Sequence, residues 1–258
     1  MARSAFATAV KRDRIVVVAA IAVLTALAWA YTARLAWSSA AMAESMAMPN
    51  TTPWSSADFA FMFTMWAVMM VAMMLPSATP MILLYGRVRE ARVAHGRPYA
   101  PTAAFVAGYI TVWIAFSLAA TTLNWGLHLS GDLSSMMGHT TPVFGGILLI
   151  IAGLFQWTPL KDTCLAHCRS PIGFLMGNWR EGSSGAMKMG LHHGAYCLGC
   201  CWMLMVLLFV LGVMNLPWVA VLTVMVLGEK ILPRGDLLSR LLGAAMVVWG
   251  GWLITVAA

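Results

Sequence analysis

Charged residues are scarce in this chain, and their scarcity excludes a water-soluble globular protein. Only 10% of the 258 residues are Asp, Glu, Lys or Arg, whereas 61% are hydrophobic, and the mean hydropathy is +0.81. A chain of this size cannot hide so much apolar surface from water, so its solvent must be lipid. The composition therefore predicts a polytopic membrane protein whose first partner is the lipid bilayer.

Acidic residues are rarer than basic ones, with 9 Asp and Glu against 16 Lys and Arg. The basic residues form short clusters between apolar runs, so membrane topology explains them better than a nucleic-acid partner, and none is expected. The chain also lacks a phosphate-binding glycine loop, a Ser-His-Asp set and paired catalytic carboxylates. Hydrolytic or ATP-driven chemistry is therefore not indicated.

Apolar runs near the ~20 residues needed to cross a bilayer predict an all-α transmembrane helix bundle of about seven spans. We expect a basic cytoplasmic tail over 1–14 and one helical domain over 15–258. Prolines in the second run predict a kink. The expected spans are Ile15–Trp37, Asp58–Tyr85, Ala103–Leu127, Pro142–Trp157, Lys188–Val213, Leu216–Leu232 and Leu237–Val256.

Loops that contain Lys and Arg alternate along the chain with loops that lack them. Four basic residues precede the first span, and others fill the second and fourth loops, whereas 38–57 and 128–141 contain no Lys or Arg. The positive-inside rule then places the N-terminus in the cytoplasm and the C-terminus outside, in a multi-pass protein of the cytoplasmic (inner) membrane. The first run exceeds the ~7–15 apolar residues of a signal peptide, so we expect a retained anchor.

Thiols and imidazoles lie inside the fifth span. His193, Cys197 and Cys201 follow each other at helical spacing, Cys200 shares their face, and His192 lies on the neighbouring stripe. Polar groups at membrane depth need partners, and these are soft ligands for a transition metal. The sequence therefore predicts an intramembrane metal site, with copper favoured over zinc. The alternative is that a buried cysteine acts as a small hydrophobic residue.

A second cluster precedes this span. Cys164 and Cys168 are one helical turn apart, and His167 is adjacent. The sequence leaves open whether these residues join the intramembrane thiols or form a separate hand-off site. All five cysteines fall in the predicted cytoplasmic loop or the membrane, so structural disulfides are not expected.

Methionines form a stripe down one face of the second span. Met65, Met69 and Met73 recur at helical spacing, and thioether sulfur is a ligand for Cu(I). The alternative is that these side chains only fill gaps in the core. Pro76 lacks a backbone N–H and so frees the carbonyl of Ala72 one turn earlier.

One pair of charged residues closes the sixth span. We expect Lys230 to extend to the cytoplasmic surface, and Glu229 to turn into the bundle. Neighbours on a helix do not face each other, so Glu229 needs a partner elsewhere. Arg180 and Lys188 are the candidates.

Several ordered motifs over 54–252 resemble an uncharacterised prokaryotic family of predicted metal-binding integral membrane proteins. The resemblance implies a metal-binding membrane protein. It does not extend to the first span. The motifs are Trp66–Pro76, Cys164–Cys168, Trp179–Gly182, Gly190–Trp202, Gly212–Leu216 and Glu229–Pro233.

Three functions fit these residues. The favoured hypothesis is a protein that binds or moves Cu(I) through the thiols and the methionine stripe, with a metallochaperone or another membrane protein as partner. Because binding displaces thiol protons, affinity should rise with pH. A thiol–disulfide redox protein using Cys197 and Cys200, which form a C-x-x-C motif, is the second. A non-catalytic assembly subunit of a membrane complex is the third.

Overall fold

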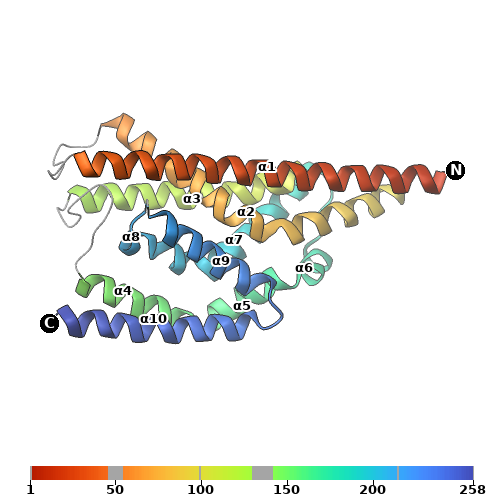
Figure 1. The fold of residues 1–258 in the computed structure, drawn as a ribbon. Helices are drawn as coiled ribbons and strands as arrows, with labels where there is room; N and C mark the ends of the chain where they lie inside the picture. Colours follow the sequence, from red (N-terminus) through yellow and green to blue (C-terminus); the bar gives the residue numbers. More distant parts are fainter. Residues whose placement is uncertain (1, 46–54, 99, 130–141, 214, 258) are drawn as a thin grey trace.

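A computed structural model describes residues 2–45, 55–98, 100–129, 142–213 and 215–257, and every regular element in them is a helix (Figure 1). The all-α prediction is confirmed. The helices are α1 (Ala2–Ser45), α2 (Ser56–Ala94), α3 (Thr102–Leu129), α4 (Pro142–Phe155), α5 (Pro159–Arg169), α6 (Pro171–Asn178), α7 (Gly182–Val206), α8 (Leu208–Leu211), α9 (Leu216–Ile231) and α10 (Gly235–Ala257).

Within these described residues, 5 helices are long and apolar enough to cross a membrane, and the bent pair α4–α5 raises the number to 6. The expected seven spans are therefore not confirmed. The difference arises at α9, whose 16 residues extend only about 24 Å, less than the ~30 Å hydrocarbon core. The spanning stretches are Ile15–Ser38, Ser56–Ala94, Thr102–Gly126, Gly182–Leu211 and Gly235–Val256.

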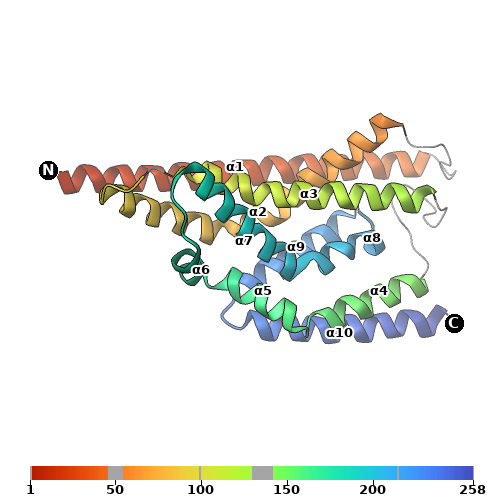
Figure 2. The same cartoon turned by 180° about the vertical axis from the view of Figure 1, so that it is seen from behind.

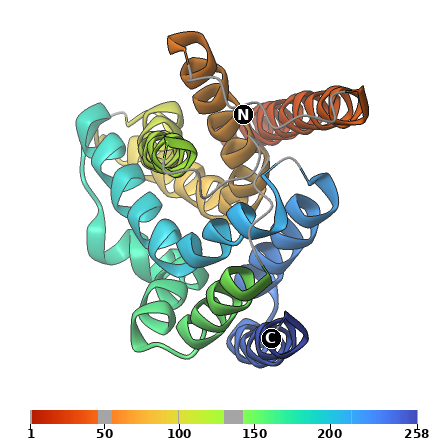
Figure 3. The same cartoon turned by 90° about the vertical axis from the view of Figure 1, so that its left-hand side faces the viewer.

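The two ends of the chain lie at opposite ends of the bundle (Figure 1). Seen along the bundle, α1 and α10 lie at its periphery, whereas α7 runs from the edge of the bundle toward its centre (Figure 3). α9 runs back toward the end of the bundle where α5 and α6 lie (Figure 1). Much of the buried interior is formed by α2, which carries the methionine stripe, and by α7, which carries three of the cysteines.

α2 bends near its middle (Figures 1 and 2), where Pro76 and Pro80 stand inside the helix. Its start is fixed by a capping box in which Ser55 and Asp58 satisfy each other's backbone N–H groups. The carbonyl of Ala72, left without a helical partner by Pro76, accepts a 3.1 Å hydrogen bond from the indole of Trp29 on α1. The expected freed carbonyl therefore anchors α1 to α2.

α3 and α7 approach until their backbones touch, as Figure 2 shows where α7 crosses from α3 toward α5. A Cβ added at Gly190 would collide with the carbonyl of Phe105, and one added at Gly108 would collide with that of Met187. Small residues allow such contact between helices in a membrane. The contact also places Tyr109, next to Gly108, against the thiol face of α7.

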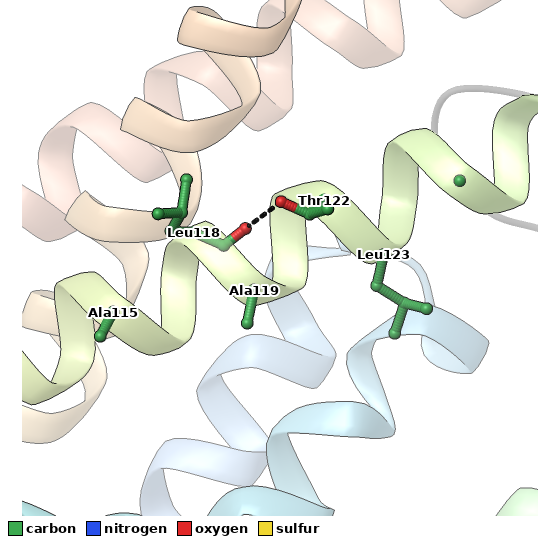
Figure 4. A pocket seen from close by; sticks show the side chains of 6 residues that line it. Ala115, Leu118, Ala119, Thr122 and Leu123 are labelled. Carbon is green, nitrogen blue, oxygen red and sulfur yellow. Dashed lines mark hydrogen bonds between the residues drawn. The ribbon is translucent and has the colours of Figure 1, made fainter.

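An apolar groove runs along α3 on a different side from the thiols (Figure 4). The hydroxyl of Thr122 donates to the carbonyl of Leu118 at 2.9 Å, so it is satisfied within the helix. The groove therefore offers apolar contact of the kind that lipid chains make. It is lined by Ala115, Leu118, Ala119, Thr122, Leu123 and Gly126.

A buried ion pair joins α5 to α9. The ammonium of Lys161 donates to both carboxylate oxygens of Glu229 at 2.9 and 2.8 Å, and the two side chains are 0% and 1% exposed. The expectation that Arg180 or Lys188 partners Glu229 is wrong. The bend between α4 and α5, 63°, turns Lys161 into the bundle, whereas the sequence suggested a surface loop.

Arg92 and Glu181 pair where α2 ends and α7 begins, outside the spanning stretch of α7. The hydrogen bond from Arg92 holds the pKa of the Glu181 carboxyl below its ordinary value. A lowered pKa means that this contact stabilises the fold at neutral pH and is lost as the pH falls through that pKa. Because the pair is partly exposed, its contribution is small.

The Lys161–Glu229 pair predicts a specific mutational pattern. Lys161→Met leaves a buried carboxylate unpaired and should lower the free energy of unfolding by about 3–5 kcal/mol. The double variant Lys161→Met with Glu229→Leu removes both charges and should recover most of that loss. Thermal or denaturant unfolding in detergent measures both. Equal destabilisation by the single and double variants would contradict the pairing.

Candidate functional site

The polar face of α7 is buried as the helical spacing predicts. His193 is 3% exposed, and Cys197, Cys200 and Cys201 are 1% exposed or less. All five cysteines of the chain are free thiols. The cysteines of α7 therefore form a compact group within the apolar core.

α5 brings the second pair of cysteines onto this face. The sulfur of Cys168 lies 4.0 Å from that of Cys200. Cys164 packs on Gly199, where a Cβ would lie only 2.7 Å from the Cys164 sulfur. The sequence left open whether Cys164 and Cys168 join the intramembrane thiols. In the structure the two cysteine clusters lie together.

Cys197 lies at the junction of α2, α3, α7 and α9. Its sulfur is 2.9 Å from the ammonium nitrogen of Lys230 and 3.1 Å from the hydroxyl of Tyr109. That hydroxyl donates its single proton to the carbonyl of Met74 at 3.0 Å. In this arrangement the S–H of Cys197 donates to the Tyr109 oxygen, and its sulfur accepts from Lys230.

The position of Lys230 corrects the expectation that it reaches the cytoplasmic surface. Its ammonium turns inward and donates to the hydroxyl of Ser77 at 3.1 Å as well as to Cys197. Sequence reasoning missed Tyr109 as a neighbour of the Cys197 thiol and Ser77 as an acceptor of Lys230. The available signal was a hydroxyl at membrane depth, but other residues of α2 and α3 share it, so it was not selective.

The other thiols of α7 turn toward their own helix. The thiols of Cys200 and Cys201 donate to the carbonyl of Cys197 at 3.1 and 2.9 Å. Cys200 is thus shared between this carbonyl and the sulfur of Cys168 on α5. The pair that bridges two helices is Cys168 and Cys200.

The sulfur separation can be compared with metal–thiolate geometry. Two metal–sulfur bonds of about 2.3 Å span about 4.6 Å in a line and about 3.8 Å at the tetrahedral angle. The 4.0 Å between Cys168 and Cys200 lies inside this range. Over the described parts of the chain, no group of three or more His, Cys, Asp or Glu side chains is placed to hold a metal ion. The geometry thus fits two sulfur ligands better than four.

The histidines surround the thiols without forming one set with them. His193 stacks on Phe105 and Tyr109, at centroid distances of 6.1 and 5.7 Å. Its Nδ1 is buried and has no hydrogen-bond partner. His192 and His167 both pack on Tyr196, at 4.8 and 4.1 Å. These last two lie on a more exposed side of the site.

The methionine stripe is buried and leads away from the thiols. Met65, Met69 and Met73 are 2%, 1% and 1% exposed. The carbonyl of Met74, which accepts from Tyr109, places the Pro76 end of the stripe at the cluster. Met65 lies about 13 Å further along the helix axis. Packing accounts for all three, and their role as ligands remains a prediction.

Fold and site define a class: an all-helical protein with helices able to span a membrane and with thiols gathered in its core. Residues 63–253 match the family model PpoB2, copper chaperone, and the chain belongs to this family. This agrees with the metal-related family that the motifs resemble. Neither a curated protein nor a solved structure matches the chain.

The distance between Cys168 and Cys200 predicts a cross-link. In a variant with Cys164, Cys197 and Cys201 changed to Ser, mild oxidation should join the remaining two thiols in a disulfide, because their sulfurs need to move only about 2 Å. Mass spectrometry of alkylated samples detects it. In the matched variant, which keeps only Cys164 and Cys201, both thiols should stay reduced and therefore be alkylated. Equal cross-linking in the two variants would contradict the geometry.

Proposed function

We propose that the protein is a membrane copper chaperone that binds Cu(I) between Cys168 and Cys200, with Cys197 as a neighbouring third sulfur. The observation that carries the proposal is the 4.0 Å approach of a buried thiol, Cys200, and a half-buried one, Cys168, from different helices. The membership of the chain in a copper chaperone family supports the choice of metal.

Cu(I) suits this donor set better than zinc does. Thiolate sulfur is a soft ligand that suits both Cu(I) and zinc, but two thiolates are enough to hold Cu(I). Structural zinc, in contrast, takes four ligands in a tetrahedron. A pair of thiols with an adjacent third sulfur therefore favours the monovalent ion.

Transfer would proceed by ligand exchange without a change in oxidation state. An incoming thiol would lose its proton and bond to Cu(I) while one of the first two Cu–S bonds breaks, and the released thiolate would take up that proton, so the ion moves by one ligand at a time. Cys197, one helical turn from Cys200, is placed to act as the incoming ligand. The stripe of Met65, Met69 and Met73 would continue the path with thioether ligands along α2.

His167 would receive the ion at the exposed edge of the site. Its Nδ1 lies 2.8 Å from the carbonyl of Thr163, which leaves Nε2 for a metal. Ligating histidines generally have their other ring nitrogen held by such an acceptor. The adjacent Cys168 then leads to Cys200. His192, against the same Tyr196 ring, would support this entry, and His193 would line the inner side.

The ligand assignment predicts the effect of single substitutions. Wild-type protein should bind one Cu(I) per chain, and Cys168→Ser or Cys200→Ser should weaken binding more than about 100-fold, because a two-ligand site loses half of its donors. Competition with a chromophoric Cu(I) chelator under reducing conditions measures the affinity. Cys201→Ser is the matched control, since that thiol is as buried as Cys200 and donates to the same carbonyl of Cys197, whereas it is Cys200 that approaches Cys168.

Cu(I) binding and disulfide formation, both measured on wild-type protein, separate the alternatives. Wild-type protein that binds no Cu(I) yet forms a reversible disulfide between Cys197 and Cys200 would favour thiol redox chemistry. Protein that does neither would favour an assembly role. Equal Cu(I) affinity in wild type and both ligand variants would reject the assigned site.

A further inference from the structure

A positive charge lies directly beside the thiols, where a cation is proposed to bind. The ammonium of Lys230 is 2.9 Å from the sulfur of Cys197 and 3.1 Å from the hydroxyl of Ser77. Lysine supplies three donors and no acceptor, and in its ordinary state it carries one positive charge. Such a charge repels any metal ion, so its presence at a metal site requires an explanation.

No carboxylate in the described parts of the chain pairs with Lys230. The adjacent Glu229 is held by Lys161, which donates to both of its oxygens. That pair is neutral as a unit and adds no net charge to the site. The remaining neighbours of the ammonium, the Tyr109 and Ser77 hydroxyls and the cysteines, carry no charge until a thiol loses its proton.

The charge balance depends on the ion. Two thiolates with a monovalent cation carry a net charge of −1, which the ammonium of Lys230 neutralises. Two thiolates with a divalent cation are already neutral, so the same ammonium leaves an uncompensated positive charge in the apolar core. An unpaired charge in such surroundings is costly, and repulsion between ammonium and metal doubles for a divalent ion.

We propose that Lys230 is a specificity-determining residue that makes the thiol site select a soft monovalent cation over a divalent one. This rests on the proposed function, because it assumes that the thiols bind metal. It assigns to α9 a role in the chemistry of the site as well as in packing.

The test measures how the site discriminates between ions of different charge. Lys230→Met and Lys230→Gln should lower the ratio of Cu(I) to Zn(II) affinity by at least about tenfold relative to wild type. Lys230→Arg keeps the charge and should stay near wild type. Ser77→Ala removes one acceptor of the ammonium but no charge, so it should also leave the ratio unchanged. Chromophoric chelators for each ion provide the affinities in detergent.

A second pair of ions controls for ligand preference. Ag(I) and Cd(II) are both soft, so their affinity ratio reports mainly on charge, and it should fall in the same variants. Size-exclusion chromatography identifies variants that do not fold. If neither neutral variant folds, wild type and Lys230→Arg still test the proposal, because Cd(II) binding as tight as Ag(I) binding in either protein would overturn it.

The outcomes separate this proposal from the proposed function. Wild-type Cu(I) binding with the same selectivity in the neutral variants would overturn the role of Lys230 and leave the copper site standing. A loss of selectivity in Lys230→Arg equal to that in Lys230→Met would also overturn it. Absence of Cu(I) and Ag(I) binding in wild type would reject both proposals.

Discussion

A charge inside an apolar bundle must be paired or hydrogen-bonded, and this constraint organises the centre of the molecule. Two adjacent residues of α9 satisfy this constraint with partners on different helices. Glu229 turns to Lys161 on α5, whereas Lys230 turns to Ser77 on α2 and Cys197 on α7. The last turn of α9 therefore connects α9 to α2, α5 and α7. It fixes α5 and α7 at the separation that brings Cys168 to Cys200.

Close backbone contact supplies the other half of the arrangement. Gly190 lets α7 touch α3, and the contact places Tyr109 between Met74 and Cys197. Tyr109, Cys197 and Lys230 at this junction are thus each hydrogen-bonded to a group from another helix, as buried polar groups require. The thiols occupy a position determined by several independent contacts, which limits their movement before any ligand arrives.

Helical periodicity was sufficient to predict what lies on one face of one helix. The burial of His193, Cys197, Cys200 and Cys201 follows from spacing alone, as does the freed carbonyl of Ala72. Periodicity does not specify which helix lies opposite. The sequence therefore missed Lys161 as the partner of Glu229, because the bend before α5 brings a residue of an apparent loop into the core.

The same limit explains the error at Lys230 and the uncertainty in the number of spans. A lysine near the end of a span can extend to the surface or turn inward, and only the position of Cys197 and Ser77 decides between them. Hydropathy likewise detects an apolar run but not its helical length, and α4 and α9 are shorter than an independent crossing requires.

The central claim is that thiols from two helices hold Cu(I) between them. X-ray absorption at the copper edge of wild-type protein loaded with Cu(I) tests it most directly. The account predicts a first coordination shell made of sulfur alone, with two ligands and no nitrogen or oxygen. A shell dominated by nitrogen or oxygen, or a four-coordinate site, would contradict it.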